Sequence, residues 1–322
     1  MFSTQVTTGG AEIAAPHDFG FQLRHYVIAP QVREGQKLVE IVRLSSGGLV
    51  KIDVVSRGTV DAPQLELTIL SAEPLPPEQV EEVRQRVAWH LSLDDDLRPF
   101  YAVARGDPVL SASIDYNFGG KGKRAYSMFD ALIDVILFQN TAFRRVYAMR
   151  ANLAAAFGDP FVADGRVYHA SPTPQQLAAA PLEAIRAAKV GYRDRYVKGV
   201  AEAVAGGMDL EALEQRPVDE ARQELLQLPG VGPYTADLAL ILAGRRPDAL
   251  FMDVYIREVL RQLYFGGARV PDQQLREFAQ TRWGPYQGYV GLYLTTDTEA
   301  WARNLGVTLR LRSGALSDPD LP

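Results

Sequence analysis

The sequence has no cysteine, and only four histidines occur among its 322 residues. The lack of cysteine excludes disulfides, thiolate zinc sites, a catalytic thiol and cysteine-ligated iron–sulfur clusters. The histidines are His17, His25, His90 and His169, and their wide separation along the chain indicates no histidine-rich metal site. We therefore expect no cofactor and, in particular, no iron–sulfur cluster.

Long hydrophobic runs are missing as well. The longest, Ala131 to Phe138, contains Asp134 and is far too short to cross a bilayer. The N-terminal segment MFSTQVTTGGAEIAAP lacks a basic region followed by an apolar core, so it does not have the pattern of a signal peptide. We expect a cytoplasmic protein that has no membrane partner.

Neither sign of charge is in large excess, since the formal net charge is −5 at pH 7. The acidic excess lies in the first third of the chain, and later segments contain basic groups such as Arg144, Arg145 and Arg150. Net charge bears on non-specific attraction rather than on a particular site. It therefore argues only weakly against a nucleic-acid partner.

The first part of the chain has the pattern of β-strands. Between about residues 19 and 72, four segments are rich in Val, Ile, Leu and aromatic residues with partial alternation: FGFQLRHYVIAP, KLVEIVRL, LVKIDVVSR and QLELTIL. The tetrapeptide Ser45–Gly48 separates two of them and predicts a hairpin turn. After Pro77, apolar residues spaced three to four apart predict a helix.

From about Asp94 onward the hydrophobic periodicity is helical. Ser127, with Asp130 three residues later, begins one helix in a capping-box arrangement, and prolines begin several others. The predicted fold class is α+β. A small antiparallel β-sheet domain with a flanking helix occupies residues 1–92, and an all-helical domain occupies residues 93–322.

The segment LPGVGPYTADLAL, from Leu228 to Leu240, predicts a tight turn between two helices. Gly230 and Gly232 leave the backbone unshielded, and Pro233 suits the first position of a helix. Backbone N–H groups at that helix start would form an anion site suited to a phosphate, and Val231 could fill the space between the helices. The alternative is an ordinary helix–helix connection.

Asp253, in ALFMDVYIREVL, lies 21 residues beyond Gly232, after an apolar helix and a return loop. It would stand at the start of the next helix, close to the glycine turn. Because aspartate is a favourable N-cap, this residue could serve only to cap the helix.

The glycine turn and Asp253 together resemble the signature of the helix–hairpin–helix (HhH-GPD) superfamily of base-excision DNA glycosylases. YSMFDALIDVILFQNTAFRRVYAMRANLAAAFG, KVGYRDRYVKGVAEAV and RWGPYQGYVGLYL are similar to further segments of that family. The resemblance implies two helical lobes with a cleft near Asp253. It also implies a nucleoid-associated monomer whose partner is double-stranded DNA containing a damaged base.

The resemblance implies a role for each matching residue, with Asp253 as the catalytic carboxylate. The residues implied to contact DNA are Gly230, Gly232, Tyr234, Thr235, Gln139 and Asn140. Asn140 is implied to insert into the DNA duplex as a wedge. The residues implied to line a base pocket are Tyr234, Tyr255 and Phe138. Backbone carbonyls of Leu226, Leu228 and Val231 would hold a Na⁺ or K⁺ ion.

The type of glycosylase depends on a lysine, because family members that also cleave the strand use one to form a Schiff base. The two positions where the family places it are Gln223 and Tyr234 here. We therefore expect a monofunctional enzyme of the 3-methyladenine glycosylase II type, acting on alkylated bases. The alternatives are an oxidised-purine (8-oxoguanine-type) glycosylase that uses another lysine, such as Lys189 or Lys198, and a non-catalytic damaged-DNA-binding protein.

Overall fold

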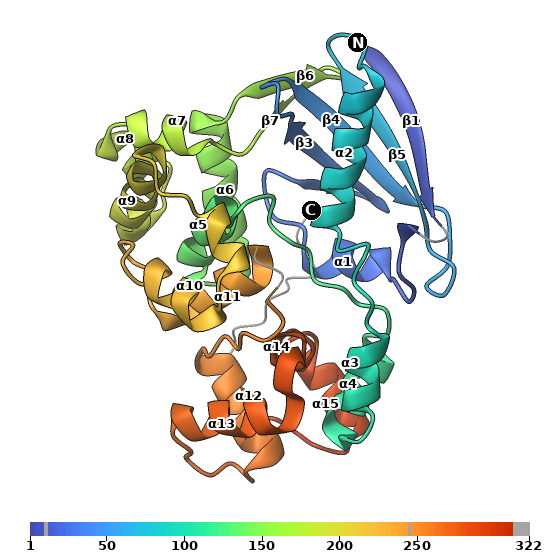
Figure 1. Cartoon of the computed structure of the whole chain (residues 1–322), viewed down its shortest axis with the longest axis vertical. Coiled ribbons are helices and arrows are strands. Elements are labelled where there is room, and N and C mark those ends of the chain that lie inside the picture. The colour runs from blue at the N-terminus through green and yellow to red at the C-terminus, as the bar shows by residue number, and fades with distance from the viewer. Residues whose placement is uncertain (10–11, 244–245, 312–322) are drawn as a thin grey trace.

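A five-stranded antiparallel sheet forms the N-terminal part of the protein, whose computed structural model describes residues 1–9, 12–243 and 246–311. The strand order is β1-β5-β4-β3-β2. The strands are β1 (Phe2–Gly9), β2 (Val32–Glu34), β3 (Lys37–Arg43), β4 (Leu49–Ser56) and β5 (Gln64–Ser71). Helix α2 (Pro77–His90) lies across one face of the sheet (Figure 1) and buries Val83 and Val87 in its core. The predicted sheet domain with a flanking helix is confirmed.

The predicted hairpin at Ser45–Gly48 is confirmed, since β3 and β4 pair on either side of it. The prediction of a strand at the start of FGFQLRHY is wrong, because this segment forms helix α1 (Phe19–His25). Asp18 caps the helix by accepting a hydrogen bond from the Phe21 amide at 3.0 Å. Phe19 and Leu23, four residues apart, pack into the core of the sheet domain, so the helical period describes this segment better than alternation.

Seven α-helices in the described part of the chain form what we call the hairpin lobe. They are α5 (Met128–Phe138), α6 (Phe143–Phe157), α7 (Pro174–Ala179), α8 (Leu182–Ala187), α9 (Asp194–Ala205), α10 (Val218–Leu225) and α11 (Pro233–Ala243). Ser127 caps α5 by accepting the Asp130 amide at 3.0 Å, as its sequence predicted. Leu132, Ile136 and most other apolar residues of α5 are buried, whereas Phe138 at its end is partly buried.

The region after residue 93 is not entirely helical, which corrects the sequence prediction. Strands β6 (Pro160–Ala163) and β7 (Arg166–His169) form a two-stranded hairpin that lies beside β3 and β4 of the main sheet. Strand β7 was not predicted, because it is only four residues long and has an arginine and a histidine at its ends. Strand β1 was also not predicted, since its FSTQVTTG sequence is largely polar and the strand lies at the sheet edge.

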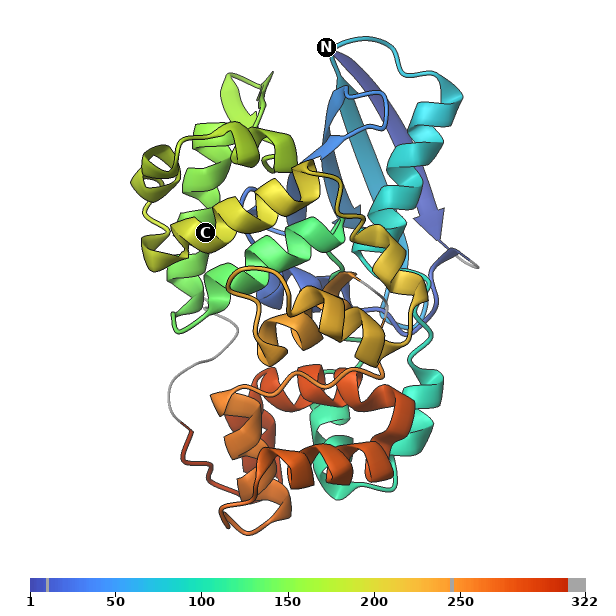
Figure 2. The same cartoon turned by 60° about the vertical axis from the view of Figure 1, so that its left-hand side comes forward.

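A second group of helices forms the C-terminal lobe, below the hairpin lobe in Figure 2. Its helices are α3 (Arg98–Ala104), α4 (Pro108–Tyr116), α12 (Val254–Tyr264), α13 (Asp272–Trp283), α14 (Gln287–Thr295) and α15 (Thr298–Asn304). Phe100 of α3 and Trp301 of α15 are both buried in its core. The early segment α3–α4 therefore completes a lobe whose other helices come from the end of the chain.

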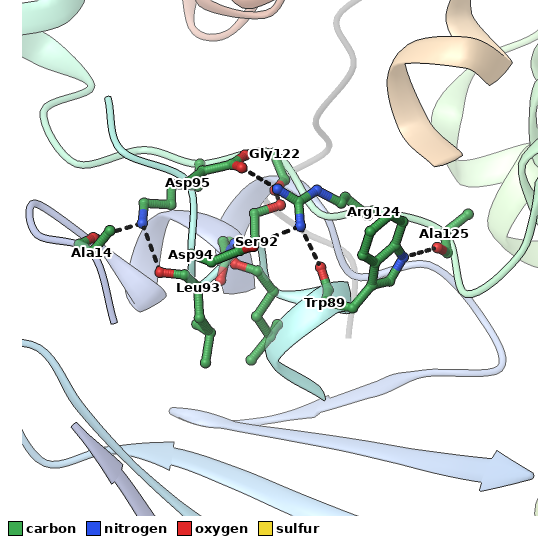
Figure 3. Close-up of polar contacts among 12 residues, drawn as sticks. Ala14, Trp89, Ser92, Leu93, Asp94, Asp95, Gly122, Arg124 and Ala125 are labelled. Atoms are coloured by element: carbon green, nitrogen blue, oxygen red, sulfur yellow. Dashed lines mark hydrogen bonds and ion pairs between the residues drawn. The ribbon is translucent and has the colours of Figure 1, made fainter. Parts of the chain in front are cut away.

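The sheet domain meets the C-terminal lobe at a polar junction centred on Arg124 (Figure 3). Arg124 donates to Asp94 at 3.0 Å and to Asp95, and its guanidinium lies 4.9 Å from the centre of the Trp89 ring. Asp95 also accepts a hydrogen bond from Tyr289 of α14 at 2.8 Å. These bonds fix the C-terminal lobe to the end of α2.

In the part of the chain that the structure describes, no helix has the length and apolarity that crossing a membrane requires.

Candidate active site at the helical hairpin

Helices α10 and α11 are joined by the predicted glycine turn. Helix α10 ends at Leu225, and α11 begins at Pro233. Within the turn, the Val231 amide donates to the Leu228 carbonyl at 3.2 Å. Val231 is buried in the core of the hairpin lobe. The predicted local structure is therefore present, with Val231 filling the space between the helices.

The two glycines of the turn have different surroundings. Gly230 has a φ of +76°, and a Cβ atom there would lie 2.2 Å from Cγ of Tyr196 on α9. A Cβ atom at Gly232 would meet nothing within 4 Å. Gly230 thus lets α9 pack on the turn, whereas Gly232 leaves the start of α11 open. The first amides of a helix have no partner within it, so they can bind an anion such as a phosphate.

Gln139 and Asn140 follow α5 and lie beside the hairpin. The Gln139 side chain donates to the Gly230 carbonyl at 2.8 Å and to the hydroxyl of Thr235 at 3.0 Å, so it holds α5 against the turn. Its backbone carbonyl accepts a hydrogen bond from Arg193. Asn140 is exposed and has a φ of +49°. The structure therefore presents Asn140 at the surface next to the turn.

Exposed cations follow Asn140 along the chain and also precede α9. Arg144 and Arg145 lie in the first turn of α6, and Lys189 lies in the loop before α9. The exposed Tyr192 ring contacts the Arg193 guanidinium, which lies 4.6 Å from the ring centre. Basic groups interleaved with an aromatic ring are suited to a nucleic-acid backbone and its bases.

Asp253 is the N-cap of α12, as its sequence predicted, and its Oδ1 accepts the Ile256 amide at 2.7 Å. Burial raises the pKa of its carboxyl above the usual value of 3.8, although backbone N–H groups of Ile256 and Tyr255 act in the opposite direction. Only one oxygen is needed for the cap. The group is therefore both a helix cap and a partly desolvated carboxylate that can interact with a ligand.

Tyr234 and Tyr255 lie close to Asp253. Burial, followed by the charge of Asp253, raises the pKa of Tyr234. Burial is also the largest cause of the raised pKa of the half-buried Tyr255, to which the Asp253 carboxylate makes a smaller contribution. The Tyr234 ring also lies 6.4 Å from the Phe251 ring. Phe138 packs instead in the hairpin lobe, with its ring 5.7 Å from that of Phe143. The structure thus places both tyrosines close to Asp253, whereas Phe138 packs within the hairpin lobe.

A second aspartate near the hairpin was missed from the sequence. Asp237 of α11 is fully buried, and its two oxygens accept from Arg222 of α10 at 2.5 Å and from Arg276 of α13 at 3.0 Å. Arg276 also donates to the Leu250 carbonyl at 2.8 Å, three residues before Asp253. A lone carboxylate within the apolar sequence of α11 was the available signal. This network ties the hairpin to the segment that carries Asp253.

The carbonyls of Leu226, Leu228 and Val231 all belong to the turn region. The Leu228 carbonyl accepts one amide and has a second lone pair available. Neutral oxygens of this kind are suitable ligands for Na⁺ or K⁺, so the donor set fits a monovalent cation. Among the described residues there is no cluster of three or more His, Cys, Asp or Glu side chains that could hold a metal ion.

Known proteins that are similar to this chain in sequence include DNA glycosylases. A probable N-glycosylase/DNA lyase of Methanothermobacter thermautotrophicus is 28% identical over 268 residues, which are 77% of this chain and 84% of that protein. A DNA-3-methyladenine glycosylase of Bacillus subtilis is 26% identical over 220 residues, 66% of this chain and 71% of that protein.

Among solved structures, the 3-methyladenine DNA glycosylase of Archaeoglobus fulgidus has the same fold. It superposes with a TM-score of 0.74 at 22% identity, over 91% of this chain and 97% of that one. The model of the HhH-GPD superfamily of base excision DNA repair proteins matches residues 133–285, which include both the glycine turn and Asp253. Residues 133–285 are therefore a domain of the HhH-GPD superfamily of base excision DNA repair proteins.

Proposed function

We propose that the protein is a monofunctional DNA glycosylase that removes alkylated bases from double-stranded DNA in base excision repair. The observation that carries the proposal is the position of Asp253. Its carboxyl is partly desolvated and lies close to Tyr234 and Tyr255. Asp253 also follows the segment that Arg276 ties to the hairpin through the Leu250 carbonyl. In the proposal the enzyme acts as a cytoplasmic, nucleoid-associated monomer. A Na⁺ or K⁺ ion would be held by the carbonyls of Leu226, Leu228 and Val231.

The chemistry follows from these groups. The open amides at the start of α11 bind a DNA phosphate, and Asn140 enters the duplex as the damaged nucleotide rotates out, at a cost of roughly a few kcal/mol. As the N-glycosidic bond breaks, its electron pair leaves with the base and positive charge develops on the sugar. The Asp253 carboxylate stabilises that charge. A water molecule then adds to the sugar carbon, and its proton passes to the carboxylate or to solvent.

The absence of strand cleavage is part of the proposal. Gln223 and Tyr234 stand where the family resemblance places a Schiff-base lysine. Lys198 points to α7, since its ammonium donates to the Ala178 carbonyl and pairs with Glu202 at 3.2 Å. The alternative of an oxidised-purine glycosylase with lyase activity is favoured by the name of the Methanothermobacter relative, so one experiment needs to separate the two.

The test measures free-base release from duplexes that contain 3-methyladenine, hypoxanthine or 8-oxoguanine, with and without later alkali. Wild-type protein is compared with Asp253→Asn. We expect release of the alkylated base by the wild type, strand breaks only after alkali, and loss of release in the variant. Strand breaks without alkali, trapped by borohydride, would support the lyase. Specific binding without release from any duplex would support a non-catalytic damage-binding protein.

A further inference from the structure

The side-chain amide of Gln139, directly after α5, is bound to the helical hairpin. Its Nε2 donates to the Gly230 carbonyl at 2.8 Å and to the Thr235 hydroxyl at 3.0 Å. A side-chain amide nitrogen has two N–H donors, and both have an acceptor here. Thr235 is only 2% exposed, so its hydroxyl faces the protein interior. The Gln139 nitrogen therefore has no donor left for a DNA phosphate or base.

The backbone of Gln139 is held as well. Its carbonyl accepts hydrogen bonds from the Arg193 guanidinium and, at 3.4 Å, from the Tyr192 hydroxyl, which both precede α9. The next residue is the exposed Asn140, whose φ of +49° is a left-handed conformation. Non-glycine residues adopt this conformation at an energetic cost, so it persists where the surrounding structure imposes it. The contacts of Gln139 therefore fix the backbone from which Asn140 projects.

The turn that accepts these bonds also carries the open amides at the start of α11. Gly230 lies two residues before Gly232, and Thr235 lies in the first turn of the helix. The Gly230 carbonyl is not one of the three that would hold a monovalent cation, so its bond to Gln139 does not compete with that ion. A single residue therefore joins the place where a phosphate would bind to the residue that would enter the duplex.

From these contacts we propose that Gln139 is a positioning residue that couples phosphate binding at the hairpin to the insertion of Asn140 into the duplex. This role rests on the proposed glycosylase function and deepens it. Gln139 makes no contact with DNA itself and acts through Asn140. When the amides of α11 bind a phosphate, Gln139 holds Asn140 at a fixed position relative to that phosphate, where it replaces the nucleotide that rotates out.

Gln139→Met tests the coupling, because methionine has a similar length and no hydrogen-bond donor. Equilibrium binding is measured with a duplex that contains one tetrahydrofuran abasic nucleotide and with the same duplex undamaged. We expect affinity for the abasic duplex to fall about tenfold, as expected for Asn140→Ala, and affinity for the undamaged duplex to stay within about twofold. Adding Asn140→Ala to Gln139→Met should cause almost no further loss, because the wedge is already displaced.

Gln227→Met is the matched control, because the exposed Gln227 amide also lies at the hairpin but donates to the Gln223 carbonyl of α10 at 3.4 Å. In this background Asn140→Ala should keep its full loss of about tenfold. The fluorescence of 2-aminopurine placed beside the abasic nucleotide gives a second measurement, since an inserted side chain changes the stacking of its neighbours. The change in fluorescence on binding should disappear in Gln139→Met and remain in Gln227→Met.

If Gln139→Met impairs folding, Thr235→Val removes one acceptor of the same amide and should give the same pattern with a smaller loss. Losses that add in the double variant with Asn140→Ala would overturn the coupling and make Gln139 a direct DNA contact. Equal losses on both duplexes would leave Gln139 a structural role only. The proposed function survives either result. If the wild type binds the abasic duplex no better than the undamaged one, the proposed function and the role of Gln139 both fail.

Discussion

Asp237 and Asp253 lie near opposite ends of one polar network, and their surroundings differ in kind. Asp237 is fully buried, and guanidinium groups from α10 and α13 occupy both its oxygens. Asp253 is half-buried and accepts backbone amides, and burial raises its pKa. The first carboxylate has no exposed surface, and two guanidinium groups balance its charge. The second retains capacity for a ligand and is poorly solvated, which is the condition under which a carboxylate interacts strongly with a developing cation.

The comparison teaches that a carboxylate's partners, more than its burial, indicate its use. A buried aspartate between two arginines holds elements together, and removing a partner leaves an uncompensated charge. An aspartate whose hydrogen bonds come only from backbone N–H groups can be replaced by asparagine with little structural effect, although the negative charge is lost. The predictions below test this division of roles.

The largest effect is expected from Asp253→Asn. Asparagine caps helices about as well as aspartate, so the thermal unfolding temperature should stay near that of the wild type. Loss of the charge should slow base release by about 10³-fold, since one preorganised electrostatic group contributes on this scale. Single-turnover release, thermal unfolding and duplex binding measure the three properties. Full activity in the variant would assign Asp253 to capping alone.

Asp237→Asn should show the reverse pattern. It leaves Arg222 and Arg276 without their shared counter-charge, and we expect a loss of about 3 kcal/mol in the free energy of unfolding. Base release per folded molecule should fall much less than in Asp253→Asn. Urea unfolding measures the free energy of unfolding. Active-site titration gives the fraction of folded protein, by which the rate of base release is normalised. A stable but inactive variant would contradict the structural role.

The glycine turn offers a matched pair. Gly230→Ala places a methyl group against Tyr196 at positive φ and should cost at least about 2 kcal/mol of stability. Gly232→Ala meets no neighbour, so it should keep the stability and weaken binding to damaged and undamaged duplexes alike. Urea unfolding and binding titrations at one salt concentration distinguish the two. Unaltered DNA affinity in Gly232→Ala would remove the phosphate role of the turn.

A smaller effect is expected from Asn140→Ala. The exposed side chain contributes to the duplex complex only, so affinity for a lesion duplex should fall about tenfold, or ~1.4 kcal/mol. Affinity for the same lesion in a single strand should be unchanged. Fluorescence anisotropy on both substrates provides the measurement. Equal losses on the two substrates would argue against a wedge.

The smallest effect concerns pH. Burial raises the pKa of the Asp253 carboxyl above its usual value of 3.8. Activity should therefore be lost as the pH falls through this raised pKa, because only the ionised carboxylate is active. The folded protein binds this proton more tightly than the unfolded chain does. Ionisation of Asp253 therefore lowers stability as pH rises between the two pKa values. Asp253→Asn should remove this dependence, which pH-resolved unfolding can detect.

Local rules predicted much of this molecule. The sheet with its flanking helix, the Ser127 cap, the proline at the start of α11 and the Asp253 cap all follow from residues that act on their immediate neighbours. Phe19–His25 was predicted wrongly because a short apolar segment fits either period.

The contacts that join distant segments could not be predicted from one sequence. The bond from Gln139 to the Gly230 carbonyl, the two arginines on Asp237 and the approach of His25 to Asp297 each link elements far apart along the chain. No local pattern encodes such a pair, since either partner alone resembles an ordinary surface or capping residue. The roles assigned to the site residues therefore remain predictions for the variants above to test.

The C-terminal lobe combines α3 and α4 with helices from the end of the chain. During synthesis, Phe100 and Leu110 therefore leave the ribosome long before the residues that cover them. The hairpin lobe, built from continuous sequence, can fold earlier. A nascent chain can therefore complete the glycine turn before Asp253 and helices α12–α15 have been made, and the proposed site forms only after both lobes have folded.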